Sequence, residues 1–168
     1  MNEKVAALLN NQINKEYYSA YLYLAFADYY RHASLDGFAH WFEVQAQEER
    51  GHALKFLRYL QDNDVKVVFE AIAAPDAAFS DFRQPLAAAY KHEQYVTSLS
   101  HAIYKEARQD EDYRCCQFLE WFIAEQMEEE KSARELLDHF DLLDGDRKGL
   151  LMLDDQLAQR PVSAAADN

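Results

Sequence analysis

The sequence predicts an all-α fold, in which four long helices form a bundle, a long crossover joins the second helix to the third, and a short fifth helix follows at the C-terminus. Three observations support this prediction. Apolar residues recur at three- and four-residue steps along four long segments. Only four Gly and three Pro occur among 168 residues, so few positions interrupt a helix. The connection from Asn63 to Ser80 is too long for an ordinary turn.

The chain has the length of one domain, expected over residues 1–168. Helices are expected at about 3–31, 36–62, 82–110, 113–141 and 147–158, with a polar tail at 160–168. Ser34 or Asp36 can cap the second helix. The crossover means that the third helix need not reverse direction. A short edge strand from Val65 to Phe69 is an alternative for part of the crossover.

Composition and charge exclude several classes of protein. The formal net charge of −13 argues against nucleic acid as a partner and favours cations. No apolar stretch approaches membrane-spanning length, and no basic region followed by an apolar run begins the chain, so we expect a cytoplasmic protein with no membrane partner. Cys115 and Cys116 are adjacent on an expected helix, a poor arrangement for a mutual disulfide, and we expect both to be reduced and structural.

Polar residues interrupt the apolar stripe near the middle of each long helix. The residues concerned are Glu16 in the first helix, Glu49 and His52 in the second, Glu93 in the third, and Gln126 and Glu129 in the fourth. Glu49 and His52 lie three residues apart, so both point from one face of the helix, which is a spacing that suits metal ligands. A buried carboxylate is costly unless it is paired, protonated or bound to metal.

The two halves of the chain repeat this pattern. The interval from Glu16 to Glu49 and the interval from Glu93 to Gln126 are both 33 residues, and each ends with a second ligand-type residue three positions later. Two hairpins packed around a pseudo-twofold axis would therefore bring all six side chains together. Four such carboxylates repel one another, which a pair of divalent metals resolves. Carboxylates with one imidazole favour iron first and manganese second, with zinc as a competitor.

With these residues in view, the chain resembles the ferritins, and most closely the bacterial non-haem ferritins, over about residues 3–159. The segments that carry the resemblance are the crossover, the run from Tyr90 to Gln94, the run from Glu125 to Lys131, and the short final helix. Gln126 and Glu129 replace the second Glu-x-x-His of bacterioferritins and di-iron oxygenases. Arg50 stands where bacterioferritins use Met to bind haem, so haem is not expected.

The resemblance implies roles for the site residues. Glu16, Glu49 and His52 would bind one iron, and Glu49 would bridge to a second iron. Glu93 and Glu129 would hold that second iron, with Gln126 as a weak or outer ligand. A third iron would lie at Glu48, Glu125, Glu128 and Glu129. Tyr23 would be a hydrogen-bond donor or a one-electron donor, although a packed core tyrosine is an equal alternative.

The activity that the resemblance implies is that of a ferroxidase, in which O₂ or H₂O₂ oxidises Fe(II) to Fe(III) at the di-iron centre. The ferric product would be stored as mineral inside a homo-oligomeric, 24-subunit cage, and the final helix would pack against symmetry-related copies. The oxidant, the iron exit route and a storage or stress role stay open. Cys116 and Leu119 occupy positions that are acidic in the threefold channels of animal ferritins, so iron would enter elsewhere or through Glu111, Asp112 or Glu120.

Three other functions are weighed against storage. A di-iron or di-manganese oxidase on the same bundle would act on an organic substrate without storing iron. A purely structural assembly would carry the acidic cluster as a vestige, but the complete ligand set speaks against this. A DNA-protecting mini-ferritin is disfavoured because the chain has no basic arm and has a fifth helix.

Overall fold

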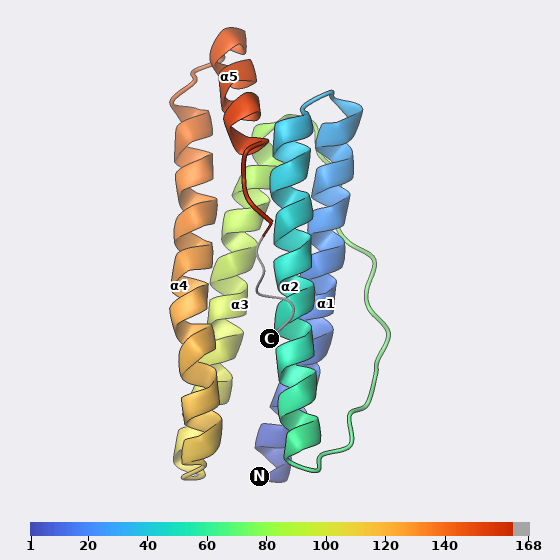
Figure 1. Cartoon of the computed structure of the whole chain (residues 1–168), viewed down its shortest axis with the longest axis vertical. Coiled ribbons are helices and arrows are strands. Elements are labelled where there is room, and N and C mark those ends of the chain that lie inside the picture. Colours follow the sequence, from blue (N-terminus) through green and yellow to red (C-terminus); the bar gives the residue numbers. More distant parts are fainter. Residues whose placement is uncertain (163–168) are drawn as a thin grey trace.

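Five helices make up the regular structure of the computed structural model, which describes residues 1–162 (Figure 1). They are α1 (Glu3–His32), α2 (Asp36–Asp62), α3 (Arg83–Gln109), α4 (Tyr113–Asp141) and α5 (Arg147–Leu157). No strand occurs in this part of the chain, so the predicted all-α class is confirmed. None of the helices within residues 1–162 combines the length and the apolarity needed to cross a bilayer.

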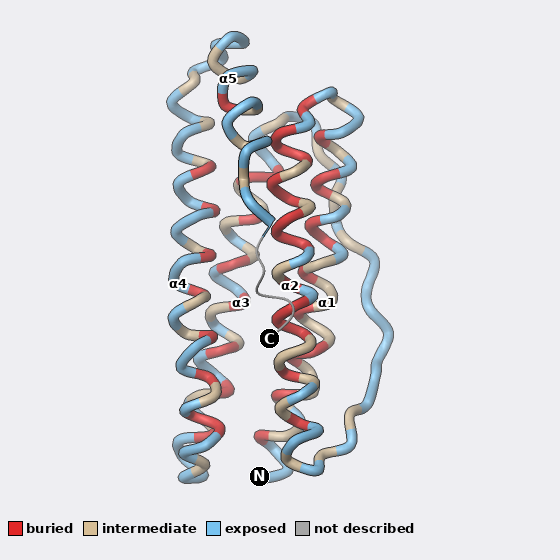
Figure 2. The backbone as a smooth tube through the Cα atoms, viewed as in Figure 1, coloured by how far each residue is buried: buried red, intermediate tan, exposed pale blue. Residues whose placement is uncertain are grey.

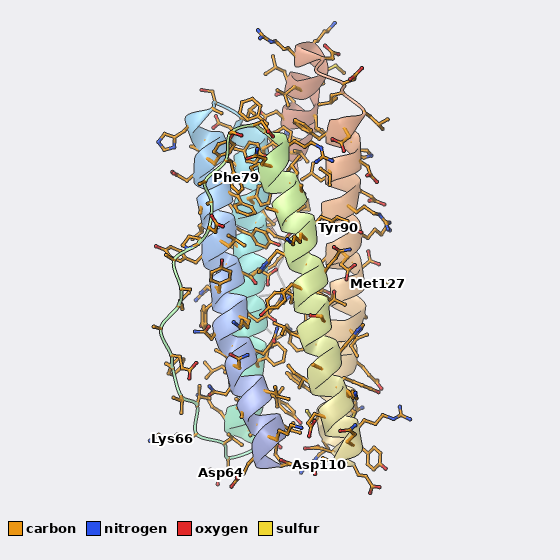
Figure 3. All side chains as sticks on the ribbon, turned by 180° about the vertical axis from the view of Figure 1, so that it is seen from behind. Asp64, Lys66, Phe79, Tyr90, Asp110 and Met127 are labelled. Carbon is orange, nitrogen blue, oxygen red and sulfur yellow. The ribbon has the colours of Figure 1, made fainter. Side chains whose placement is uncertain are left out.

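The crossover spans the length of the bundle, as expected. It rises outside α1 from Asp64 at one end to Phe79 at the other, and α3 consequently runs in the same direction as α2 (Figures 1 and 3). The side-chain amide of Asn10 on α1 donates to the carbonyl of Val68 (3.0 Å) and accepts from its N–H (2.8 Å). The Asn10 side chain thus pairs with the backbone N–H and C=O of Val68, which a neighbouring strand would otherwise do. The alternative of an edge strand at Val65 to Phe69 is wrong.

Two apolar clusters fill the bundle, one toward each end. One cluster contains Phe26, Tyr30 and Phe42, and the other contains Leu9 and Phe56. The polar residues that interrupt each helical stripe lie between the two clusters along the chain of every long helix, and Figure 2 shows that the buried positions face the inside of the bundle. Apolar packing on both sides therefore holds this polar layer away from water.

The N-terminus of α2 is capped by α5 rather than by a local residue. Leu35 occupies the N-cap position and offers no side-chain hydrogen bond, and Ser34 has a left-handed φ of 59°. The carboxylate of Asp154 accepts from the N–H of Phe38 at 2.9 Å instead. The expectation that Ser34 or Asp36 caps α2 is therefore wrong. A distant acceptor satisfies the same unpaired N–H group.

The chain after α5 is anchored at its start. We expected a polar tail from residue 160, but Arg160 is only partly exposed and contacts α2. The remainder of the expected tail, residues 163–168, lies outside the described residues. Cys115 and Cys116 are free thiols, in agreement with the sequence prediction, and burial raises the pKa of Cys115 to about 12. That thiol is therefore poorly reactive at neutral pH.

Candidate metal centre

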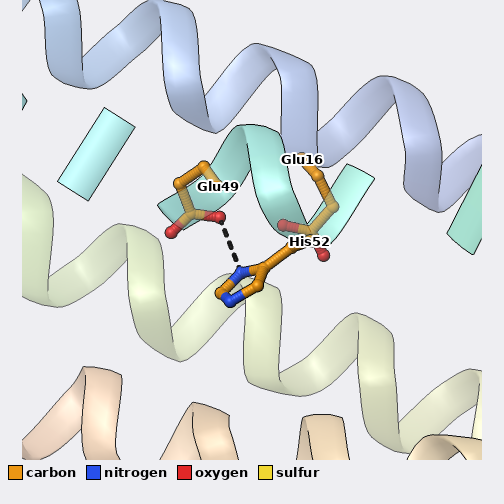
Figure 4. Close-up of side chains that lie close together, drawn as sticks. All are labelled: Glu16, Glu49 and His52. Carbon is orange, nitrogen blue, oxygen red and sulfur yellow. Dashed lines mark ion pairs between the residues drawn. The ribbon is translucent and has the colours of Figure 1, made fainter. Parts of the chain in front are cut away.

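The first half of the polar layer is built by α1 and α2. Glu16, Glu49 and His52 each offer a ligand atom, and these atoms lie within 4.8 Å of one another (Figure 4). The three residues are 2%, 2% and 6% exposed. Glu49 Oε2 lies 3.4 Å from His52 Nδ1. The Glu-x-x-His spacing on one helical face therefore produces a compact group, which α1 completes from the neighbouring helix.

The carboxylates of this group lack enough hydrogen-bond donors. Gln12 donates to Glu16 Oε1 at 2.8 Å, but Glu16 Oε2 and Glu49 Oε2 are buried and have no hydrogen-bond partner. Burial raises the pKa of Glu16 well above its usual value, and the nearby charge of Glu49 raises it further. Unsatisfied buried oxygens of this kind are uncommon, because each costs free energy. A divalent cation fits the group, since it would satisfy both oxygens and offset their repulsion.

The second half of the layer is built by α3 and α4. Glu93, Gln126 and Glu129 are 1%, 6% and 6% exposed. The amide of Gln126 donates to Glu93 Oε2 at 2.6 Å and to the carbonyl of Glu93 at 3.1 Å. The amide of Gln45, from α2, donates to Glu129 Oε2. Burial, followed by the charge of Glu93, raises the pKa of Glu129 to about 8. These carboxylates are held by amides rather than left unsatisfied.

Tyr23 links α1 to the second half of the layer. Its ring is buried against Phe42, with ring centres 5.7 Å apart, and its hydroxyl donates to Glu93 Oε1. Burial, with the charge of Glu93, raises the pKa of Tyr23 well above its usual value. The phenol therefore stays protonated and acts as a hydrogen-bond donor to a candidate ligand. The alternative role of Tyr23 as a one-electron donor stays a prediction.

The four residues expected at a third metal position are only partly brought together. Glu125 and Glu129 form a group with His52, whose ligand atoms lie within 4.8 Å of one another. His52 Nε2 lies 3.9 Å from Glu125 Oε1. Glu48 instead forms an ion pair with Arg160, and Glu128 is exposed and belongs to no such group within residues 1–162.

His52 faces both groups of ligands. Its Nδ1 is turned to Glu49 and its Nε2 to Glu125. An imidazole that binds a metal through one nitrogen can donate a hydrogen bond through the other. Binding at Nδ1 would therefore leave an Nε2–H group directed at the carboxylate of Glu125. The ring couples the two candidate positions.

Three residues of the site were missed from the sequence. Gln12 and Gln45 each lie four residues before a candidate ligand, Glu16 and Glu49, and the same 33-residue interval separates the two glutamines. That repeat is a signal from which both could have been predicted. Arg160 had no comparable signal, because its partners are on α2, far away in the sequence.

The fold and the site together define a four-helix-bundle protein with a buried carboxylate–histidine group that could hold metal. A model of the ferritin-like domain matches residues 6–143. The chain belongs to the ferritin family, and the resemblance found in the sequence is confirmed.

Similar proteins extend over nearly the whole chain. The bacterial non-heme ferritin of Staphylococcus epidermidis is 34% identical over 160 residues, which covers 95% of this chain and 96% of the relative. A probable bacterial non-heme ferritin-like protein of Haemophilus influenzae is 33% identical over 98% of this chain and 99% of the relative. The structure of an open pore ferritin from Archaeoglobus fulgidus matches with a TM-score of 0.94 and 37% identity, covering 96% of this chain and 99% of that chain.

Proposed function

We propose that this protein stores and detoxifies iron by oxidising Fe(II) to Fe(III), with O₂ or H₂O₂ as the oxidant, and by holding the ferric product as mineral inside a cage. One observation carries the proposal. Buried oxygens of Glu16 and Glu49 have no hydrogen-bond partner and lie beside His52 in a group of metal-ligand dimensions. Membership of the ferritin family supports the same activity.

In this proposal Fe(II) is the substrate of the site. Glu16, Glu49 and His52 would bind one Fe(II), while Glu93 and Glu129 would bind the second, with Glu49 as the bridge. Burial raises the pKa of Glu49 well above its usual value, and the charges of Glu93 and Glu129 raise it further, so the carboxylate of Glu49 lies near both halves of the layer. Carboxylates must lose their protons to bind a metal, and binding therefore releases protons.

The protein's share in the oxidation is to position two Fe(II) ions, each of which gives up one electron to the oxidant. Gln126 and Tyr23 orient the carboxylate of Glu93 through the hydrogen bonds described above. The surrounding apolar clusters exclude bulk water from the reacting ions. Arg50 is exposed, and we expect no haem to be bound there.

Storage requires an enclosed volume, and the archaeal relative is described as an open pore ferritin. We infer that copies of this chain assemble in the cytoplasm into the 24-subunit shell that the family resemblance implies. Size-exclusion chromatography after iron loading tests this inference. A monomer or dimer that consumes O₂ with Fe(II) but forms no soluble mineral would instead indicate a di-iron or di-manganese oxidase without storage.

The catalytic assignment is tested by Glu49→Ala, with Glu135→Ala as the matched control on an exposed part of α4. Removing the bridging carboxylate should slow Fe(II) oxidation by about 100-fold, because both metal positions lose a ligand. The measurement is the appearance of ferric absorbance after Fe(II) is mixed with air-saturated buffer. The control should oxidise Fe(II) at the wild-type rate. Equal rates for Glu49→Ala and wild type would show that the assignment is wrong.

A further inference from the structure

The segment that follows α5 runs back along α2 (Figure 1), and Arg160 in this segment contacts α2. Arg160 Nη2 donates to Glu48 Oε2 at 2.7 Å and to Gln45 Oε1 at 2.8 Å, and Nη1 donates to the carbonyl of Trp41 at 3.1 Å. The guanidinium lies over the indole of Trp41, 4.5 Å from its centre. His40 Nε2 donates to the carbonyl of Arg160 at 2.8 Å. Contacts to α2 thus hold both the guanidinium and the backbone carbonyl of Arg160.

The contacts of Arg160 reach two candidate ligands of the third metal position. The ion pair to Glu48 is direct, and the side chains of Arg160 and Glu48 are only 20% and 18% exposed. The second connection runs through Gln45. Because Arg160 occupies the amide oxygen of Gln45, the amide nitrogen is directed at Glu129, to which it donates. The guanidinium of Arg160 therefore fixes the positions of both Glu48 and Gln45, the residue that donates to Glu129.

A divalent cation at this position would compete with the guanidinium. Both are positive, both require the oxygen of Glu48, and at close range in a partly buried site they repel each other. The ligand atoms of Glu125, Glu129 and His52 already lie within 4.8 Å of one another. Of the two remaining expected ligands, Glu128 is exposed and Glu48 is paired with Arg160. The arginine fills the electrostatic role of a cation while the segment is attached.

We propose that Arg160 is a latch that metal displaces: a divalent cation at the third position takes Glu48 from Arg160 and releases residues 158–162 from α2. This inference rests on the proposed metal site and adds a regulatory contact to it. Occupancy of the third position is thereby coupled to the position of the C-terminal segment. The latch also sets the affinity of the third position, because each binding event must break the ion pair.

The experiment uses zinc, a divalent ion that undergoes no redox step, so that its readout is independent of iron oxidation. Metal-free protein in a Trp121→Phe background is titrated with Zn(II) while the fluorescence of Trp41 is followed, and zinc-soaked crystals are examined by anomalous scattering. Arg160→Gln removes the latch. Arg147→Gln is the matched control, since it makes the same change at the start of α5. Arg160→Lys keeps the charge without the forked hydrogen bonds.

The latch predicts that zinc at Glu48 and Glu125 changes the emission of Trp41 in the Trp121→Phe protein with Arg160 intact, and that Arg160 has left Glu48 in the zinc-soaked crystals. Arg160→Gln should bind this zinc about tenfold more tightly, as expected for the loss of a charge-assisted hydrogen bond, and Arg160→Lys should fall between the two. Arg147→Gln should match the wild type. Zinc at the third position in Arg160→Gln alone would show that zinc does not displace Arg160 and would overturn the latch.

Three further results would overturn the latch while leaving the proposed function intact. The first is zinc bound between Glu48 and Glu125 with Arg160 still paired to Glu48. The second is equal affinity of the third position in the wild type and in Arg160→Gln. The third is no zinc at that position in either protein while zinc occupies Glu16, Glu49 and His52. A site at Glu16, Glu49 and His52 that takes no zinc would overturn both the latch and the metal function on which it rests.

Discussion

At the scale of single residues, Glu129 in the candidate metal centre shows how a buried carboxylate couples folding to protonation. Glu129 is 6% exposed, and burial raises its pKa to about 8. Its ordinary value is 4.5, so at neutral pH the folded, metal-free protein holds a proton that the unfolded chain has lost. Metal binding must expel that proton. A bound cation would take the place of that proton in neutralising the buried carboxylate.

The stability of the metal-free protein should therefore depend on pH through Glu129. The folded state binds more protons than the unfolded state between pH 4.5 and about 8, so this contribution is complete below 4.5 and is lost as pH rises through 8. The side chain in Glu129→Gln cannot titrate. Between pH 4.5 and about 8, the unfolding free energy of this variant should therefore fall less steeply with pH than that of the wild type, by at most ~1.4 kcal/mol per pH unit.

Urea unfolding of the metal-free protein at pH 6 and pH 8 measures this effect. Glu135→Gln is the control, because it removes an exposed carboxylate from the same helix. Comparing the two variants separates the buried group from the general repulsion of an acidic chain. If the stability of Glu129→Gln falls between pH 6 and pH 8 as steeply as that of the wild type, the raised pKa of Glu129 does not contribute to the pH dependence of stability.

At the scale of helices, α5 and α2 depend on each other. Asp154 on α5 accepts from the N–H of Phe38 in the first turn of α2, where no local side chain caps the helix. Gly37 permits the close approach, since a Cβ there would overlap the carbonyl oxygen of Asp154. The short helix therefore completes the bundle at the end from which the latch segment begins. An isolated helix of this length would be marginal.

Gly37→Ala should destabilise the protein, although Gly to Ala inside a helix normally stabilises by about 1 kcal/mol. The added methyl group must displace the backbone of α5, and the cap to Phe38 is then lost. Asp154→Ala removes only the cap and should cost ~1 kcal/mol. Urea unfolding of the metal-free protein measures both changes. Asp155→Ala, at an exposed neighbouring position, should have little effect. A neutral Gly37→Ala would contradict the close packing.

At the scale of the whole molecule, the crossover presents apolar side chains to solvent. Val68, Phe69 and Ile72 form what we call the crossover patch, and they are 60%, 70% and 45% exposed. Asn10 holds the backbone of this patch against α1, so its side chains are directed outward from a fixed segment. A rigid, exposed apolar surface is typical of an interface. We expect the patch to be covered by another copy of the chain in the cage.

Phe69→Glu should therefore weaken assembly, because a charge would be buried in the contact. Size-exclusion chromatography with light scattering should show a shift from the cage to smaller species. Lys66→Gln, also exposed on the crossover, makes the chain more negative by the same single unit and should leave the assembly intact. An unchanged oligomer in Phe69→Glu would place the interface elsewhere.

The sequence by itself determined the helices, the crossover between parallel α2 and α3, and the six positions of the buried polar layer. Those features follow from local periodicity, because residues three and four apart share a face of a helix wherever the helix packs. The two equal 33-residue intervals then predicted that Glu16 lies at the same depth in the bundle as Glu49, and Glu93 at the same depth as Gln126.

Only the tertiary structure decided which side chains meet across the bundle. The cap that Asp154 provides to α2, the pairing of Asn10 with Val68, and the capture of Glu48 by Arg160 all join segments far apart in the chain. No helical period encodes such contacts, since they depend on where a connecting segment returns and on the rotamers that packing allows. For that reason the sequence identified the buried candidate ligands but not the arginine that pairs with Glu48.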